Sequence, residues 1–202
     1  MELIVVRSPH WLDASPAVNI PIRMISTLGP QGTSSENAAR HLWETRGPKQ
    51  DPSVQLYDTY EEAGQAVKTG IASHLVVANA YSRVNLFYMD PELSLTSAFL
   101  CDTPPYGLAA PSPEKVPQSV RVATHPAATP LINELLPAWY ALADVTNADS
   151  TSAAALKAER SEIDLALTTR PAAALHRLQF ISRTRTIRML WSVFTLDPHT
   201  NP

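Results

Sequence analysis

Thr-Leu-Gly-Pro-Gln-Gly-Thr-Ser-Ser-Glu, at residues 27–36, is the stretch that decides the fold of this chain. Apolar side chains recur through residues 20–25 just before it and predict a strand. Gly29 and Gly32 can adopt positive φ and let a ligand approach the backbone closely. The stretch therefore predicts a tight turn that leads from a strand into a helix.

A helix is expected to begin directly after this turn. Thr33 and Glu36 have the spacing of a capping box, and the helix is predicted over 35–45. The start of a helix carries unpaired N–H groups and the positive end of its dipole, so carboxylates and phosphates bind there. No lysine follows the glycines, which excludes a nucleotide P-loop. A cap with a purely structural role is the alternative.

Strands and helices alternate along the rest of the chain, which is typical of an α/β fold. Pro137 should kink or end the helix predicted at 129–143. Further strands are predicted at 54–57, 74–79, 93–100, 120–123, 144–146, 164–168 and 189–196. Further helices are predicted at 59–68, 129–143, 153–160 and 171–178.

Composition excludes several classes of protein. The chain has 202 residues, 45% of them hydrophobic, and a net charge of -3, which argues against an electrostatic interaction with nucleic acid. A single cysteine, Cys101, excludes an intramolecular disulfide and most cysteine-based metal sites. No apolar run reaches the ~18 residues that span a bilayer. We therefore expect a cytoplasmic protein that binds neither membranes nor nucleic acid.

Residues 29–36 resemble a known signature. They are similar to the Gly-Pro-x-Gly-Thr-aromatic-Ser-Glu motif that opens the prephenate dehydratase catalytic domain, with Ser34 at the aromatic position. The Thr-Ser-Ser-Glu version is similar to prephenate decarboxylases of the bacilysin, aeruginosin and salinosporamide type. Two further runs, 87–93 and 101–109, resemble the decarboxylases and are unlike dehydratases.

This resemblance covers nearly all of the chain from Pro21 to Leu196 and implies the architecture. It implies two α/β lobes with a cleft between them, as in the prephenate dehydratase catalytic domain, which is periplasmic-binding-protein-like type II. The first lobe would hold residues 21–103 and 179–197, and the second 104–178. Residues 1–20 would form an N-terminal arm. No regulatory domain is expected.

The departures from the dehydratase pattern bear on the reaction. Dehydratases carry Thr-Arg-Phe near the C-terminus, and its Thr is taken to protonate the departing hydroxyl. Met189, Leu190 and Trp191 stand there in this chain. A thioether and an isobutyl group cannot donate that proton. A shift in register would restore a Thr-Arg pair at Thr184 and Arg185.

The resemblance and the helix-cap pattern together nominate site residues. Two polar clusters, facing each other across the cleft, would hold carboxylates, and two apolar side chains would lie beside the substrate hydroxyl. The clusters are Thr33, Ser34, Ser35 and Ser150, Thr151, Ser152; the apolar side chains are Met189 and Leu190. Candidate proton donors are His125, Tyr81 and Tyr106, with Tyr88 and water as alternatives. Arg83 and Arg188 would bind carboxylates or remain surface charges.

The function implied is non-aromatising decarboxylation of prephenate to dihydro-4-hydroxyphenylpyruvate, which feeds synthesis of a non-proteinogenic amino acid in a secondary metabolite. The alternatives are a prephenate dehydratase that produces phenylpyruvate and a non-catalytic dicarboxylate-binding protein. No cofactor and no metal are expected, because the ring diene accepts the electrons. A homodimer is expected from homologous folds.

Overall fold

The computed structural model describes residues 11–13 and 20–198. They form two compact units. Unit 1 takes residues up to Leu28, Ala38–Asp102 and the residues from Arg188 onward. Unit 2 takes Gly29–Asn37 and Thr103–Ile187. Each unit is a mixed α/β structure with one sheet, so the α/β prediction is confirmed.

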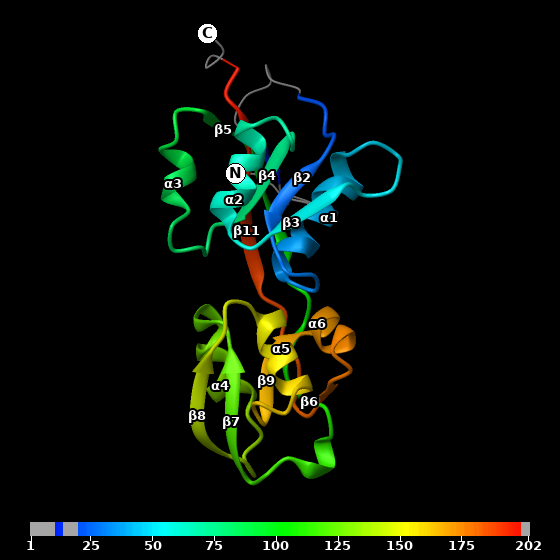
Figure 1. Ribbon diagram of the computed structural model, residues 1–202, viewed down its shortest axis with the longest axis vertical. Helices are drawn as coiled ribbons and strands as arrows, with labels where there is room; N and C mark the ends of the chain where they lie inside the picture. Colours follow the sequence, from blue (N-terminus) through cyan, green and yellow to red (C-terminus); the bar gives the residue numbers. More distant parts are fainter. Residues whose placement is uncertain (1–10, 14–19, 199–202) are drawn as a thin grey trace, which may run out of the picture. The chain divides into compact units, whose positions relative to one another are not determined.

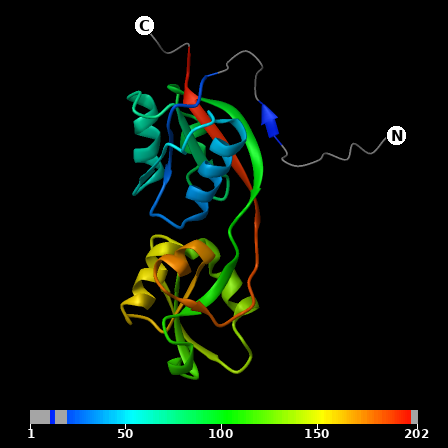
Figure 2. The same cartoon turned by 90° about the vertical axis from the view of Figure 1, so that its right-hand side faces the viewer.

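Unit 1 is built on a six-stranded sheet in the order β1-β5-β11-β4-β2-β3 (Figure 1). β2 is parallel to β3 and β4, whereas β11 is antiparallel to both of its neighbours, β4 and β5. β5 is long and curved (Figure 2). The strands are β1 (Trp11–Asp13), β2 (Ile25–Leu28), β3 (Val54–Tyr57), β4 (His74–Ala78), β5 (Leu93–Asp102) and β11 (Arg188–Leu196).

Helices α1 (Ser34–Arg46), α2 (Tyr60–Lys68) and α3 (Asn85–Tyr88) accompany this sheet, with the first turn of α1 assigned to unit 2. The hydroxyl of Thr59 accepts a 3.1 Å hydrogen bond from the Glu62 amide and caps α2. The continuous apolar run of β4 is buried on both faces, as expected for a central strand.

Unit 2 is built on a five-stranded sheet in the order β10-β6-β9-β7-β8. β7 is parallel to β8 and β9, and β6 is antiparallel to β9. The strands are β6 (Tyr106–Ala110), β7 (Ser119–Thr124), β8 (Ala141–Asn147), β9 (Leu165–Thr169) and β10 (Gln179–Phe180). The helices are η1 (Pro113–Lys115), η2 (Pro126–Ala128), α4 (Pro130–Leu135), α5 (Thr151–Glu159) and α6 (Arg170–Leu175).

The helix predicted over 129–143 is wrong in its second half. α4 ends at Leu135, and residues from Ala141 onward form β8. Leu136 precedes Pro137 and has ψ of 119°, because the proline ring disfavours helical backbone at the preceding residue. Of the two effects expected from Pro137, ending the helix is the one observed.

The units differ from the expected lobe boundaries at two segments and at Thr103, which belongs to unit 2. Residues 179–187 belong to unit 2 because β10 pairs with β6 and Arg185 pairs with Tyr106. Residues 29–37 also belong to unit 2. Of the expected N-terminal arm, residues 1–10 and 14–19 lie outside the described residues. Trp11–Asp13 form β1 and pair with β5, so this part is a strand rather than an irregular arm.

The described helices are all too short or too polar to cross a bilayer. In the same residues, no three His, Cys, Asp or Glu side chains are grouped to hold a metal ion.

Candidate functional site

The predicted polar residues of unit 2 lie at one edge of its sheet. The parallel strands β7, β8 and β9 end at Thr124, Asn147 and Thr169, and η2, α5 and α6 begin shortly after them. Ligands of open α/β sheets bind outside the carboxyl ends of the parallel strands. This edge is therefore the candidate site of unit 2.

The turn between β2 and α1 is fastened to this edge. The Ser152 hydroxyl donates to the Gln31 carbonyl at 2.8 Å, and the Thr169 hydroxyl donates to the Gly32 carbonyl at 2.6 Å. The two polar clusters predicted to face each other across a cleft therefore lie in the same unit. Thr169 was not among the predicted site residues, although its position two residues before Pro171 is typical of a helix cap.

Gly32 has a role different from the one predicted. Its φ is +87°, as expected, whereas Gly29 is not among the residues with positive φ in the described chain. A Cβ on Gly32 would lie 2.9 Å from the Cα of Ala172. The missing side chain thus makes room for the first turn of α6 rather than for a ligand.

The capping box at the start of α1 is present. The Thr33 hydroxyl accepts a 3.3 Å hydrogen bond from the Glu36 amide, and the Glu36 carboxylate accepts a 2.7 Å hydrogen bond from the Gly32 amide. Thr33, Ser35 and Glu36 are buried, while Ser34 is partly exposed. The first turn of α1 is therefore held from both sides, with Ser34 as its accessible side chain.

Tyr106 joins the two polar clusters. Its hydroxyl lies 2.8 Å from the Ser34 hydroxyl. Burial raises the pKa of the Tyr106 phenol, and hydrogen bonds with the side chains of Ser34 and Thr151 partly oppose that rise. The phenol therefore keeps its proton at neutral pH, within a group of three hydroxyls drawn from β6, α1 and α5.

The second cluster caps α5 as predicted. The Ser150 hydroxyl accepts a 2.9 Å hydrogen bond from the Ala153 amide. The Thr151 carbonyl accepts a 2.7 Å hydrogen bond from the buried Thr168 hydroxyl. Ser150 is therefore a cap, whereas the side chain of Thr151 reaches Tyr106.

His125 caps η2 at the carboxyl end of β7. Its Nδ1 accepts a 3.2 Å hydrogen bond from the Ala127 amide, so the neutral ring carries its proton on Nε2. Burial lowers the pKa of His125, and the charge of Asp149 acts in the opposite direction. The ring is therefore mainly neutral at pH 7, which makes it a hydrogen-bond donor rather than a cationic acid.

Tyr81 belongs to unit 1, whereas Ser34, Tyr106 and Thr151 belong to unit 2. It donates a 2.9 Å hydrogen bond to the Glu61 carboxylate, which also forms a 3.3 Å ion pair with Arg83. Burial and then this hydrogen bond raise the pKa of Tyr81. A phenol whose proton is directed at a carboxylate of the protein is a poor candidate for the proton donor.

Tyr88, the weaker alternative, belongs to a closed ring of hydrogen bonds in unit 1. Its hydroxyl lies 2.6 Å from that of Ser192, Ser192 donates to the Asn79 carbonyl oxygen at 2.8 Å, and the Asn79 amide donates to Tyr88 at 3.2 Å. The phenolic proton of Tyr88 is thereby directed at Ser192. This ring of hydrogen bonds was not predicted from the sequence, because Asn79 and Ser192 are 113 positions apart in the chain.

Met189 and Leu190 are consecutive residues of β11 in unit 1, so their side chains point to opposite faces of the strand. Met189 packs against the apolar core, whereas Leu190 is 36% exposed. The strand pairs Met189 with Cys101 and Leu190 with Leu100, and it begins only at Arg188. Thr184 and Arg185 therefore precede the strand.

The two candidate arginines are both paired with carboxylates of the protein. Arg83 pairs with Glu61, and Arg188 donates to Asp102 at 2.9 Å. Their side chains are 63% and 68% exposed. Both arginines therefore resemble ordinary surface charges, which was the second of the two roles expected for them.

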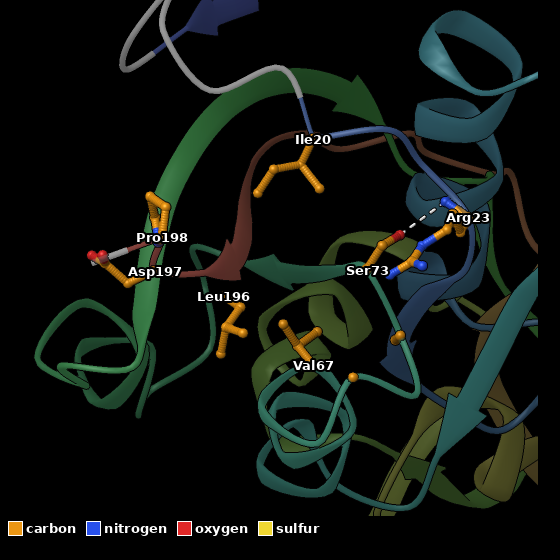
Figure 3. Close-up of a pocket in the computed structure, with 9 residues that line it drawn as sticks. Ile20, Arg23, Val67, Ser73, Leu196, Asp197 and Pro198 are labelled. Carbon is orange, nitrogen blue, oxygen red and sulfur yellow. Dashed lines mark hydrogen bonds between the residues drawn. The ribbon is translucent and has the colours of Figure 1, made fainter. Parts of the chain in front are cut away.

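A hollow of about 290 Å³ lies next to the residues that precede β4, within unit 1 (Figure 3). Its lining is mostly apolar, with Ile20, Val67 and Leu196 around it. The Ser73 hydroxyl that borders it is already bonded to the backbone of Arg23 and Met24. The hollow has none of the grouped hydroxyls of unit 2, so we do not assign the reaction to it.

Sequence comparison identifies the relatives. No family model matches the chain. A protein from Planktothrix agardhii (strain NIVA-CYA 126/8) named prephenate decarboxylase is 37% identical over 184 residues, which are 89% of this chain and 91% of that protein. The chain belongs to the prephenate decarboxylase family. A family member from Bacillus subtilis (strain 168), with the same name, is 34% identical over 179 residues, 84% of this chain and 85% of that protein.

Solved structures share the fold at lower identity. A prephenate dehydratase from Arthrobacter aurescens in complex with L-Phe has a TM-score of 0.67 at 18% identity, covering 87% of this decarboxylase-family chain and 61% of the dehydratase. A periplasmic substrate-binding protein of an ABC transporter from Coxiella burnetii has a TM-score of 0.51 at 11% identity, covering 89% of this chain and 87% of that one. These likenesses confirm the predicted fold class.

Proposed function

We propose that this protein decarboxylates prephenate without aromatising the ring. The observation that carries the proposal is the 37% identity to a prephenate decarboxylase across 91% of that protein. The cluster of three hydroxyls from Ser34, Tyr106 and Thr151 also supports the proposal. Neutral hydrogen-bond donors can bind a carboxylate without a buried positive charge.

In the proposed reaction the ring carboxylate leaves as CO₂ and its electron pair moves into the adjacent double bond. The carbon next to the carbinol then takes one proton, and the hydroxyl remains. The product is dihydro-4-hydroxyphenylpyruvate. Atoms balance as one prephenate and one proton giving one CO₂ and one product, with no oxidant or reductant.

The residues of unit 2 have separate roles in this proposal. The hydroxyls of Ser34 and Thr151 hold a carboxylate at the start of α1, where the positive end of the helix dipole favours a negative charge. Tyr106 delivers the proton, since its phenol is protonated at neutral pH and its hydroxyl lies 2.8 Å from the Ser34 hydroxyl of that carboxylate site. His125 donates a hydrogen bond from Nε2 and remains neutral. Thr33, Ser35, Ser150 and Ser152 shape the two helix starts.

Met189 supports the retention of the hydroxyl in this proposal. Its thioether, which packs against the apolar core, stands at the position where the resemblance places the Thr that acts as the acid of dehydratases. A site without that acid gives the carbinol oxygen no proton, so carbon is protonated instead.

The test is product NMR after incubation of the protein with prephenate in deuterated water. The expected product retains the hydroxyl and carries one deuterium at the ring carbon next to the carbinol. Phenylpyruvate as the main product would indicate dehydration instead. Tight binding of prephenate without turnover would indicate a dicarboxylate-binding protein.

The proposal extends to the cellular context, where it rests on the resemblance alone. The product would feed a non-proteinogenic amino acid in a secondary metabolite such as an antibiotic, in the cytoplasm, and the protein would act as a homodimer. Light scattering coupled to size exclusion tests the dimer, which would have twice the chain mass of 22.1 kDa.

A further inference from the structure

Thr169 stands at the centre of the contacts that hold the β2–α1 turn. It ends β9, is fully buried, and lies within unit 2 together with the turn. Its hydroxyl donates to the Gly32 carbonyl at 2.6 Å and accepts a 3.4 Å hydrogen bond from the Ala172 amide. A single buried hydroxyl therefore links the start of α6 to the turn before α1.

The geometry of the peptide gives this contact a direction. A trans peptide points its C=O and the following N–H in opposite directions. Because the Gly32 carbonyl is directed at Thr169, the Thr33 N–H faces away from Thr169. The Gly32 amide is itself held by the Glu36 carboxylate at 2.7 Å. Both peptide groups of Gly32 are thus fixed, and they set the direction in which α1 begins.

We propose that Thr169 is a positioning residue for carboxylate binding, acting through the Gly32 carbonyl on the first turn of α1. The inference rests on the proposed function of that turn. Without the Thr169 hydroxyl, the turn loses its 2.6 Å bond to the end of β9 and keeps the Ser152–Gln31 bond. The start of α1 and its Ser34 hydroxyl then meet the substrate in poorer geometry.

The test compares Thr169→Val with Thr169→Ser in prephenate turnover. Valine removes the hydroxyl at nearly constant shape, and serine retains it. A hydrogen bond to a charged group contributes about 1.5–3 kcal/mol, so misalignment of one such bond predicts a rise in KM of about tenfold or more for the valine variant. Its kcat should change by less than about threefold, since the lost interaction concerns ground-state and transition-state binding alike. The serine variant should restore KM.

Thr27→Val is the matched control. Thr27 is also fully buried and donates to a main-chain carbonyl, that of Val76, at 2.8 Å, but it lies in unit 1. This variant should lose stability without a change in KM. If Thr169 had a purely structural role, Thr169→Val would behave like Thr27→Val, with lower stability and an unchanged KM.

The outcomes separate the inference from the proposed function. An unchanged KM in Thr169→Val, or a serine variant as impaired as the valine one, overturns the role of Thr169. If the valine variant does not fold, a KM of the serine variant beyond about threefold of wild type overturns it. If the wild type does not consume prephenate, the proposed function fails. In that case the role of Thr169 is tested by the NMR amide chemical shifts of Gly32 and Thr33. These shifts should change in the valine variant and stay as in wild type in the serine variant.

Discussion

His74 gives the structure a pH dependence that can be calculated. It begins β4 and is only 6% exposed, with Nδ1 3.0 Å from the Ser73 hydroxyl. Burial lowers the pKa of His74 from 6.5 to about 4. The folded protein thus resists protonation at a position that the unfolded chain protonates readily.

The sign follows from which state binds the proton. Above pH 6.5 the ring is neutral in both states, and the stability is fully present. As the pH falls from 6.5 towards 4, only the unfolded state takes up a proton, so stability is lost. Each unit of pH costs about 1.4 kcal/mol, which gives a loss of roughly 2 kcal/mol between pH 7.5 and pH 5.

The assay is urea unfolding of wild type and of His74→Gln at these two pH values. Glutamine can bond to Ser73 but does not titrate, so its stability should fall by about 2 kcal/mol less than that of wild type. His125 and the carboxylates titrate in both proteins, and their contributions cancel in the comparison. Equal losses in the two proteins would refute a buried neutral His74.

Three further substitutions test the site. Gly32→Ala should cost about 2–3 kcal/mol in unfolding free energy, because φ is +87° and the new Cβ would lie 2.9 Å from the Cα of Ala172; a loss below about 0.5 kcal/mol in denaturant titration contradicts this packing. Ser150→Ala should cost about 1 kcal/mol through loss of the α5 cap, and Ser150→Asp should recover most of it, as measured by thermal unfolding. Tyr106→Phe should lower kcat about 10²-fold or more in a prephenate assay, whereas Tyr81→Phe should not. The reverse ranking would transfer the proton-donor role to Tyr81.

Local sequence predicted most of the longer strands and helices but only part of the site; β1, α3 and β10 were not predicted. Caps such as Ser150 and Thr59 were predictable because their partners lie three residues away. The extent of α4 was not, since apolar residues on both sides of Pro137 fit one helical period.

The assembly of the site required long-range contacts. Ser152 and Gln31 are 121 residues apart, and Thr169 and Gly32 are 137 apart. In the sequence, Ser152 and Thr169 both look like ordinary residues of a helix start. Their hydrogen bonds to carbonyls of the distant β2–α1 turn leave no local sequence pattern.

The position of β11 has a consequence for synthesis on the ribosome. This last strand lies between β5 and β4, in the interior of the six-stranded sheet. Every strand of unit 2 has been translated before β11 begins. Domains tend to fold as units while the chain emerges. Unit 1, whose first strands are translated before unit 2, therefore completes its sheet after unit 2. Until Leu196 leaves the ribosomal exit tunnel, β4 and β5 lack the strand that lies between them. In that state their unpaired edges are exposed to holdase chaperones.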